Sequence, residues 1–198
     1  RGSKHYIKHQ KRFPAEKIIG MINLDTVGRL EKKKLLVLGT DSAREWPHIF
    51  RGIGYVTGIP IAMVSQKLDS SDHTSFHEVG VPAVQLFSGA NLDYHRPTDT
   101  AEKIDLEGLI KVATVTKEAL EYLAGRKEPM NITLQGAKSQ KAGPGRTSRK
   151  VSLGSIPDFT YRGTGYRLEG TVPGSPAERA GLKKGDIIIR TNGINISS

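Results

Sequence analysis

Acidic and histidine side chains in this 198-residue sequence stand in loops that come after apolar segments. They are Asp25, the neighbouring pair Asp72 and His73, and His95. In open α/β sheets, loops at the carboxyl ends of strands project polar groups into a shared crevice. The sequence contains no cysteine, so a metal site in this chain must use carboxylate and imidazole donors. Zn(II) accepts both, and the three loops together predict a site of that kind.

Each of these residues also has a structural interpretation. Asp25 is explained equally well as a carboxylate that caps the turn after a strand, and a single histidine in a loop is usually a solvated surface residue. Two neighbours favour a functional role for His95: Tyr94 could donate a hydrogen bond to an oxyanion, and Asp99 could orient the imidazole ring. Spacing alone leaves both interpretations open.

The elements that must position these residues alternate between strands and helices, which is typical of an α/β sheet. Short apolar runs predict strands at 18–24, 35–38, 59–64 and 82–87. The remaining pattern predicts a helix before Pro14, a helix capped by Ser42, a turn of helix near 69–76, and a long helix from Asp105 to Gly125.

Two of the predicted helices have a clear apolar face. The helix after Ser42 has Pro47 in its first turn, where the missing N–H does little harm, and places Trp46, Ile49, Phe50 and Ile53 on one side. For the long helix, the predicted buried face is Leu106, Leu109, Ile110, Ala113, Leu120 and Leu123.

The formal net charge of +10 invites a nucleic-acid interpretation, but most of the excess lies in one stretch. Residues 126–150 contain seven basic side chains and one acidic side chain, and most of the stretch offers little to bury. We interpret it as a solvated, basic, flexible linker and predict no nucleic-acid partner. No apolar run approaches the length of a membrane span.

Four blocks give the first part of the chain a resemblance to the M28 metallopeptidases. They are residues 22–28, 71–76, 80–83 and 93–100, and they occur in the order that this family has. The resemblance covers about residues 1–125. It implies the mixed sheet of a zinc exopeptidase, a phosphorylase/hydrolase-like α/β fold, and an aminopeptidase activity that uses a water activated by two zinc ions.

The resemblance also implies roles for individual residues. Asp25 and His95 correspond to ligands, one for each zinc ion, and Tyr94 to a residue that helps stabilise the tetrahedral intermediate. Asp72 and His73 are implied to lie close to the substrate cleft. The family also needs an upstream His, a bridging Asp and an adjacent Glu pair that supplies the general base. None precedes the opening residues, so we expect a fragment that is inactive alone.

From residue 151 the pattern changes to short segments with frequent glycine, and residues 173–188 resemble a bacterial PDZ domain. The resemblance implies a partial all-β or α+β domain over 151–198. The loop that would hold the carboxylate of a peptide corresponds to Leu153, Gly154, Ser155 and Ile156. A peptide, including a C-terminal one, would add as a strand beside this segment. An ordinary turn at Gly154 is the other interpretation.

The leading hypothesis is therefore a metal-dependent aminopeptidase that acts on peptides or proteins. A second hypothesis is a non-catalytic, peptidase-like module that binds peptides or proteins, with a PDZ domain. Retention of Asp25, His95, Tyr94 and Asp99 together favours the enzyme. M28 proteins with appended domains are often exported, which favours a periplasmic or secreted location, although the sequence itself leaves the compartment unknown.

Overall fold

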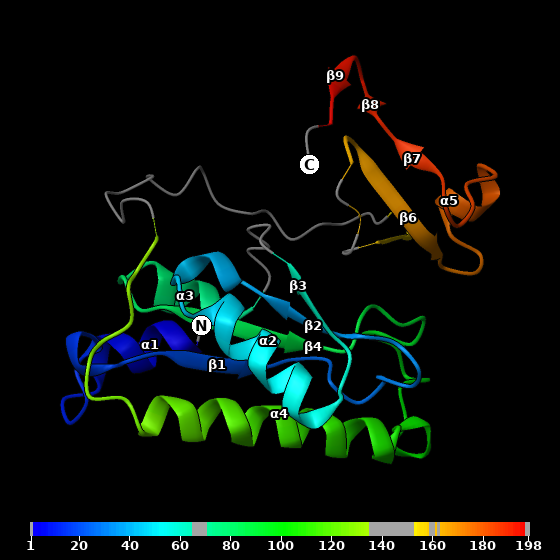
Figure 1. Ribbon diagram of the computed structural model, residues 1–198. Helices are drawn as coiled ribbons and strands as arrows, with labels where there is room; N and C mark the ends of the chain where they lie inside the picture. The colour runs from blue at the N-terminus through cyan, green and yellow to red at the C-terminus, as the bar shows by residue number, and fades with distance from the viewer. Residues whose placement is uncertain (1, 65–70, 135–152, 159–160, 162, 197–198) are drawn as a thin grey trace. The chain divides into compact units, whose positions relative to one another are not determined.

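The computed structural model describes residues 2–64, 71–134, 153–158, 161 and 163–196 (Figure 1). The chain divides into two compact units, which are described separately. One unit comprises Arg1–Gly89 with Pro97–Ser139, and the other comprises Ala90–Arg96 with Gln140–Ser198. The predicted domain limits after residues 125 and 150 stay a prediction, and most of the predicted linker lies outside the described residues.

A four-stranded mixed sheet forms the centre of the first unit. Its strands have the order β1-β4-β2-β3, with β1 parallel to β4, β4 antiparallel to β2, and β2 parallel to β3 (Figure 1). Their bounds are β1 Met21–Leu24, β2 Leu35–Leu38, β3 Ile61–Val64 and β4 Ala83–Phe87. Each strand lies inside a run for which the sequence predicts a strand, and the mixed α/β class is confirmed.

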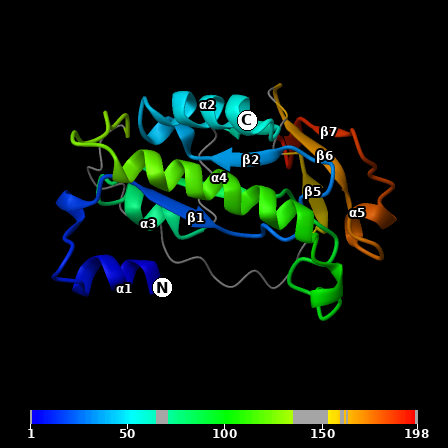
Figure 2. The ribbon, with the colours of Figure 1, turned by 60° about the horizontal axis from the view of Figure 1, so that its bottom comes forward.

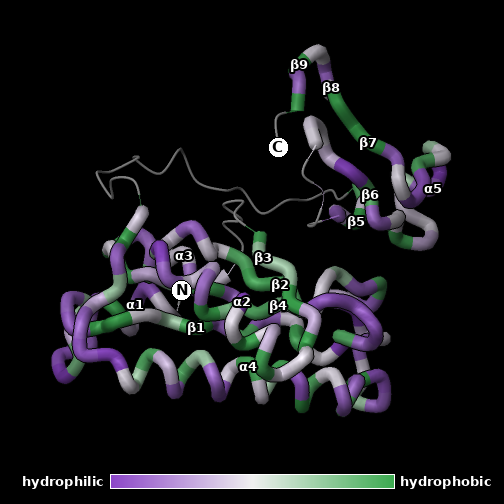
Figure 3. The backbone as a smooth tube through the Cα atoms, viewed as in Figure 1, coloured by the Kyte–Doolittle hydropathy of each residue, from purple (hydrophilic) through white to green (hydrophobic). Residues whose placement is uncertain are grey.

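Two pairs of helices cover the two faces of this sheet (Figure 2). One face carries α2 (Trp46–Thr57) and α4 (Leu106–Ala124), and the other carries α1 (Gly2–His9) and α3 (His73–His77). Side chains of the interior strands alternate between the faces: Val84 packs with α2 and α4, while Ala83 packs with α3. The hydrophobic colouring of β2 agrees with its full burial (Figure 3).

The long helix α4 forms where the sequence predicts it, but the predicted buried face is wrong. Leu106, Ile110 and Leu120 are 69%, 67% and 52% exposed. The side that faces the sheet consists of Gly108, Val112, Val115, Ala119 and Leu123. Leu123 is therefore the only member of the predicted face that is fully buried. Helix α4 has apolar residues on both sides, and the small and β-branched residues fit the narrow space above the sheet.

The predicted helix cap at Ser42 is also wrong. Helix α2 begins at Trp46 with Glu45 as the residue before it, whereas Ser42 lies in a short 3₁₀ helix, Thr40–Ser42. The buried Ser42 hydroxyl donates to the carbonyl oxygens of Gly39 at 2.7 Å and Ala83 at 3.0 Å. A buried hydroxyl needs hydrogen-bond partners, and Ser42 finds them in the residue after β2 and in β4. Ser42 therefore links these two strands and does not cap a helix.

Residues 126–134, the first part of the predicted linker, pack on the first unit. Met130 is 4% exposed, and Ile132 forms an isolated antiparallel bridge with Ala43. The backbone N–H of Thr133 donates to the carbonyl oxygen of Ser42 at 3.1 Å. This part of the segment is therefore held in place by specific contacts.

The described C-terminal residues form small antiparallel pairs of strands. The elements are β5 Ser155–Pro157, β6 Tyr166–Thr171, α5 Pro176–Arg179, β7 Ile187–Ile188, β8 Arg190–Thr191 and β9 Ile194–Asn195. Ser175 caps α5 by accepting a hydrogen bond from the Glu178 N–H at 3.2 Å, and Pro176 occupies the first turn. The Glu178 carboxylate accepts in return from the Gly174 N–H. Leu168 and Ile156 form the interior, consistent with a PDZ fold.

Candidate functional site

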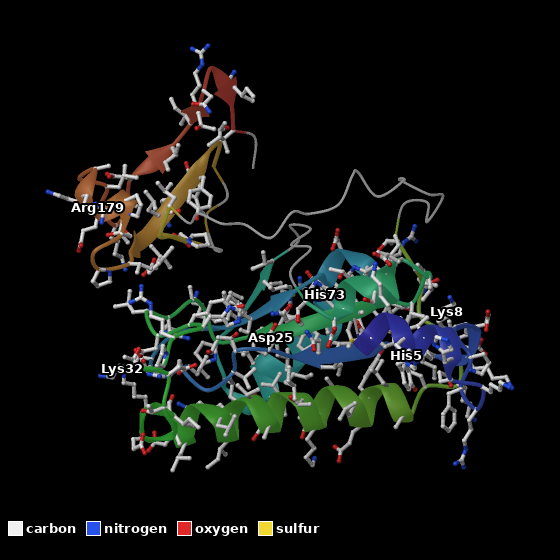
Figure 4. The ribbon with its side chains drawn as sticks, turned by 180° about the vertical axis from the view of Figure 1, so that it is seen from behind. His5, Lys8, Asp25, Lys32, His73 and Arg179 are labelled. Carbon is white, nitrogen blue, oxygen red and sulfur yellow. The ribbon has the colours of Figure 1, made fainter. Side chains whose placement is uncertain are left out.

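Asp25 stands directly after β1, at the edge of the sheet where β4 also ends. Its N–H donates to the carbonyl oxygen of Leu86 at 3.3 Å, which extends the pairing of β1 with β4 by one residue. Beyond the ends of the two strands, the Ser88 hydroxyl donates to the carbonyl oxygen of Thr26 at 2.6 Å. Because β1 and β4 are parallel, their carboxyl ends meet, and the loop after β4 starts beside Asp25 (Figure 4).

The Asp25 carboxylate is held by hydroxyl groups on both oxygens. Ser71 Oγ donates to Asp25 Oδ2 at 2.7 Å, and Thr26 Oγ1 donates to Oδ1 at 3.1 Å. The same Ser71 hydroxyl accepts from Asn23 Nδ2 at 2.8 Å, so its proton is directed to Asp25. Sequence reasoning gave Ser71 no role, and its only signal was its position directly before Asp72 in a polar segment.

Thr26 and His95 each have a backbone conformation that side chains rarely adopt. Thr26 has φ 55° and His95 has φ 58°, and Glu31 and Asn192 are further non-glycine residues of this kind. A β-branched residue such as Thr26 is an outlier in the left-handed region, whereas histidine occurs there more often. Thr26 directly follows the predicted ligand Asp25.

Asp72 and His73, predicted near the substrate cleft, face different surroundings. Asp72 is exposed and its Oδ1 accepts from the Ser3 hydroxyl of α1 at 2.7 Å. His73 is 2% exposed, with its ring edge-to-face against His77 at 5.4 Å between centroids. Only Asp72 of the pair therefore offers a side chain to solvent next to Ser71.

Tyr94 and His95 form a pair within the segment Ala90–Arg96. Their rings stack with centroids 3.8 Å apart and planes 20° apart, and the Tyr94 side chain is half exposed. Asp99, the predicted orienting partner of His95, forms an ion pair with Arg29 at 2.8 Å. The roles of Tyr94, His95 and Asp99 stay predictions.

Asp25 and His95 have donor atoms that suit a metal ion. Asp25 has one hydrogen bond to each carboxylate oxygen, which leaves lone pairs on both, and His95 supplies an imidazole. These donors have the chemistry that zinc accepts. No group of three or more His, Cys, Asp or Glu side chains able to hold a metal occurs within the described ranges.

The predicted peptide loop of the second unit lies beside α5. Gly154 has φ 76°, and a Cβ atom there would lie 2.3 Å from Ser175 Cβ, so only glycine fits. The carbonyl oxygens of Leu153 and Gly154 accept from the N–H groups of Ala177 and Val172. Ile156 is 9% exposed and points inward, while Leu153 is 49% exposed.

Comparison with known sequences places this arrangement in a family. Residues 1–120 match the sequence model of Peptidase family M28. The chain belongs to this family. Residues 169–198 of the M28 chain match a PDZ domain, which confirms the predicted second domain.

Several characterised proteins resemble parts of the M28 chain. Leupeptin-inactivating enzyme 1 of Streptomyces exfoliatus is 30% identical over 102 residues, which are 52% of this chain and 22% of that protein. The structure of an aminopeptidase from Aneurinibacillus sp. strain AM-1 superposes with TM-score 0.52 and 28% identity over 68% of this chain and 32% of that chain. A zinc aminopeptidase from Bacillus subtilis gives TM-score 0.53 and 26% identity, with coverages of 68% and 36%.

A further structure, the LapA aminopeptidase of Legionella pneumophila, shares the fold at TM-score 0.55 and 20% identity, over 64% of this chain and 36% of that chain. The M28 chain thus spans about a third or less of the length of these relatives. None of the helices in the described parts of the chain is both long enough and apolar enough to cross a membrane.

Proposed function

We propose that this chain is part of a zinc aminopeptidase and that Asp25 binds one of its metal ions. The observation that carries the proposal is the fixed Asp25 carboxylate, which Ser71 and Thr26 hold at the carboxyl edge of β1. Hydrogen bonds of this kind orient a carboxylate ligand and keep its lone pairs directed outward. The zinc aminopeptidase from Bacillus subtilis, with the same fold, supports the choice of metal.

In this proposal Asp25 and His95 each bind one of two zinc ions, and further donors beyond this pair complete each site. Zinc, when bound, supplies a Lewis acid that polarises a peptide carbonyl and lowers the pKa of water. The protein's own contribution is positioning. Tyr94 directs its phenol at the oxyanion, and the exposed Asp72 borders the path of the peptide, whereas the buried His73 supports this region from below the surface.

The experiment uses the protein expressed from its complete gene and follows hydrolysis of leucine para-nitroanilide, with zinc content measured in parallel. Asp25→Asn removes a charged ligand and should lower kcat/KM about 1000-fold with loss of zinc. Ser71→Ala leaves the carboxylate unoriented and should cost about 10- to 100-fold in activity or metal affinity, which Ser71→Thr partly restores.

Asp41→Asn is the matched control, because Asp41 is exposed and the Thr133 hydroxyl bonds to its backbone carbonyl oxygen, which the substitution leaves in place. It should leave zinc content and hydrolysis unchanged. If the Asp25→Asn variant keeps its zinc content and its rate of hydrolysis, Asp25 is not a zinc ligand. If the protein hydrolyses no amino-terminal residue with zinc present, the second hypothesis, a peptidase-like binding module, replaces the first.

For the PDZ domain we propose binding of a peptide carboxyl terminus at residues 153–156. The support is β5, which is the outer strand of its sheet and pairs only with β6 among the described strands, as strand addition requires. Leu153→Asp places a negative charge at the loop and should weaken binding of carboxylate-terminated peptides about tenfold in fluorescence polarisation. Ile194→Asp, at an exposed residue of β9, is the control. Equal binding of amidated peptides would exclude carboxylate recognition.

A further inference from the structure

Helix α1 carries two histidines, His5 and His9, one turn apart on its exposed side. Both residues are exposed, and their rings stack with centroids 4.1 Å apart and planes 24° apart. Residues four apart on an α-helix are neighbours on its surface, which explains the contact. Figure 4 shows His5 on this helix. Imidazole is a ligand that suits Zn(II), Cu(II) and Ni(II), so the pair places two such ligands side by side.

The opposite side of α1 packs on the first unit and fixes the direction in which the histidines face. Ile7 packs against the buried cluster around Phe76, and the Ser3 hydroxyl donates to Asp72 at 2.7 Å. At 3.6 residues per turn, Ser3 and Ile7 lie on the side of the helix opposite His5 and His9. The two imidazoles therefore face solvent, from which an ion can approach.

The His9 ring is held in the tautomer that a metal ligand needs. Its Nδ1 lies 2.9 Å from the backbone carbonyl oxygen of His5, and because that oxygen can only accept, Nδ1 carries the proton. In the neutral ring, Nε2 therefore keeps a free lone pair. Histidines that bind a metal commonly donate their other N–H to a backbone carbonyl in this way. The His5 ring has no hydrogen bond to any described residue, so it can turn a nitrogen toward the same ion.

His73 and His77 on α3 have the same spacing, but they lack the properties that make the α1 pair a site. His73 is 2% exposed, and His77 Nε2 lies 2.8 Å from the carbonyl oxygen of Ala83, which occupies that nitrogen. Their rings meet edge to face with centroids 5.4 Å apart. Spacing alone is thus not sufficient. Exposure of both rings and a free Nε2 distinguish His5 and His9.

We propose that His5 and His9 together chelate one divalent transition-metal ion such as Zn(II), with water in the remaining coordination positions. Because both imidazoles belong to one helix, the second binds at a high effective concentration, and the pair binds more tightly than a single histidine. Two protein ligands are fewer than the three or four of catalytic and structural zinc sites, so the bound ion exchanges with solvent. The pair lies on α1 whereas Asp25 follows β1, so occupation of one site does not require the other.

The test titrates Zn(II) into the metal-free, untagged 198-residue chain and follows the ring nitrogens of its six histidines by ¹H–¹⁵N NMR. In the free protein, His9 should be the Nδ1–H tautomer. On titration, the ring signals of His5 and His9 should shift together with one Kd of about 10–100 µM.

His5→Gln and His9→Gln should each weaken Zn(II) binding about 10- to 100-fold, because a chelate becomes a single imidazole. Circular dichroism checks that helix content is kept, as expected for glutamine, a good helix former. His48→Gln is the matched control, since His48 is an exposed histidine of α2 with no second histidine one turn away. Lys8→Gln should strengthen binding about twofold, because the exposed Lys8 is a neighbouring cation on the same helix.

Unchanged His5 and His9 signals up to about 1 mM Zn(II) in the folded protein would overturn the proposal. So would shifts confined to His95 or His48, because the ion would then lie elsewhere. Equal affinity of the parent protein and His9→Gln would also overturn it, since the two rings would not act together. Failure of the aminopeptidase proposal is seen separately, in the hydrolysis measurements on the protein from the complete gene.

Discussion

At the scale of single residues, Glu45 forms a hydrogen-bonded network with Asn131 and Arg126 in the first unit. Its side chain, only 14% exposed, accepts from the Asn131 N–H at 3.0 Å, from Asn131 Nδ2 at 2.8 Å and from Arg126 at 3.2 Å. Burial alone would raise the pKa of Glu45, but the hydrogen bonds from Asn131 and the charge of Arg126 outweigh it and lower the pKa below 4.5.

A pH dependence of stability follows from this lowered pKa. The folded carboxyl has a lower pKa than the unfolded one, so its contribution is present above the unfolded value, near 4.5, and is lost as the pH falls through the folded value. Glu45→Gln should lower the free energy of unfolding by about 2 kcal/mol at pH 7 and by much less at pH 3, measured by urea unfolding.

Glu128→Gln provides the control for this measurement, because the exposed Glu128 takes part only through its carbonyl oxygen. Glu128→Gln should leave the free energy of unfolding unchanged at pH 7 and at pH 3. Equal stability of Glu45→Gln and the parent protein at pH 7 would show that the network does not hold residues 126–134 in place.

Hydrogen bonds between residues far apart in the sequence could not be predicted from the sequence. Asp25 could be predicted as a ligand because a carboxylate after an apolar strand is a local signal, and its role stays a prediction. Ser71, which holds it, is 46 positions away, and Ser42 bonds to Ala83 across 41 positions. A hydroxyl has no sequence pattern that distinguishes a helix cap from a distant partner, so the fold had to be known before either role was visible.

At the scale of elements, the approach of α4 to the sheet depends on Gly108. The residue is buried in the first turn of the helix, and a Cβ atom there would lie 2.1 Å from Asp105 Oδ2 and 2.7 Å from Leu30 Cβ. Hydrogen bonds from the N–H groups of Gly108 and Glu31 lower the pKa of the Asp105 carboxyl. Because Gly108 has no side chain, the Asp105 carboxylate and Leu30 can both pack against the helix backbone at this position.

Gly108→Ala should therefore lower the thermal stability of the first unit, although alanine is the better helix former. Relief of the clash requires movement of Leu30 or Asp105, at a cost of about 1–3 kcal/mol, which exceeds the helix-propensity gain of about 1 kcal/mol. Gly52→Ala in α2 is the matched control, since nothing lies within 4 Å of its added Cβ. It should raise the melting temperature, and a rise in both variants would contradict the packing argument.

The strands and helices themselves were predicted well, because apolar runs and turn residues are local. The buried face of α4 was predicted wrongly, because Leu106 and Ile110 are more hydrophobic than Gly108 and Ala119, which are the residues that face the sheet. Which side of a helix with two apolar sides is buried depends on the width of the space that it enters. That width is set by Leu30 and the sheet, and it cannot be seen in the helix alone.

At the scale of the whole molecule, the outward side of α4 is an apolar surface formed by Leu106, Ile110 and Leu120. Apolar patches of this kind promote association in solution. The triple replacement with Gln should shift the 198-residue chain toward the monomer at micromolar concentration, measured by light scattering. Tyr55→Gln, at a residue of α2 that is 90% exposed, is the control. A monomeric parent protein would contradict the prediction.

The position of β4 between β1 and β2 also sets an order of assembly. β2 and β3 are joined through α2, so they can pair as soon as that short crossover has been made. Among the described strands, β1 pairs only with β4, with Met21 opposite Ala83. During synthesis β1 leaves the ribosome well before residues 83–87, so the β1–β4 pairing can form only after the segment that pairs β2 with β3 has been made. Contacts between residues far apart in sequence form more slowly than local ones, so the β2–β3 pair should be protected from hydrogen exchange earlier in refolding than β1.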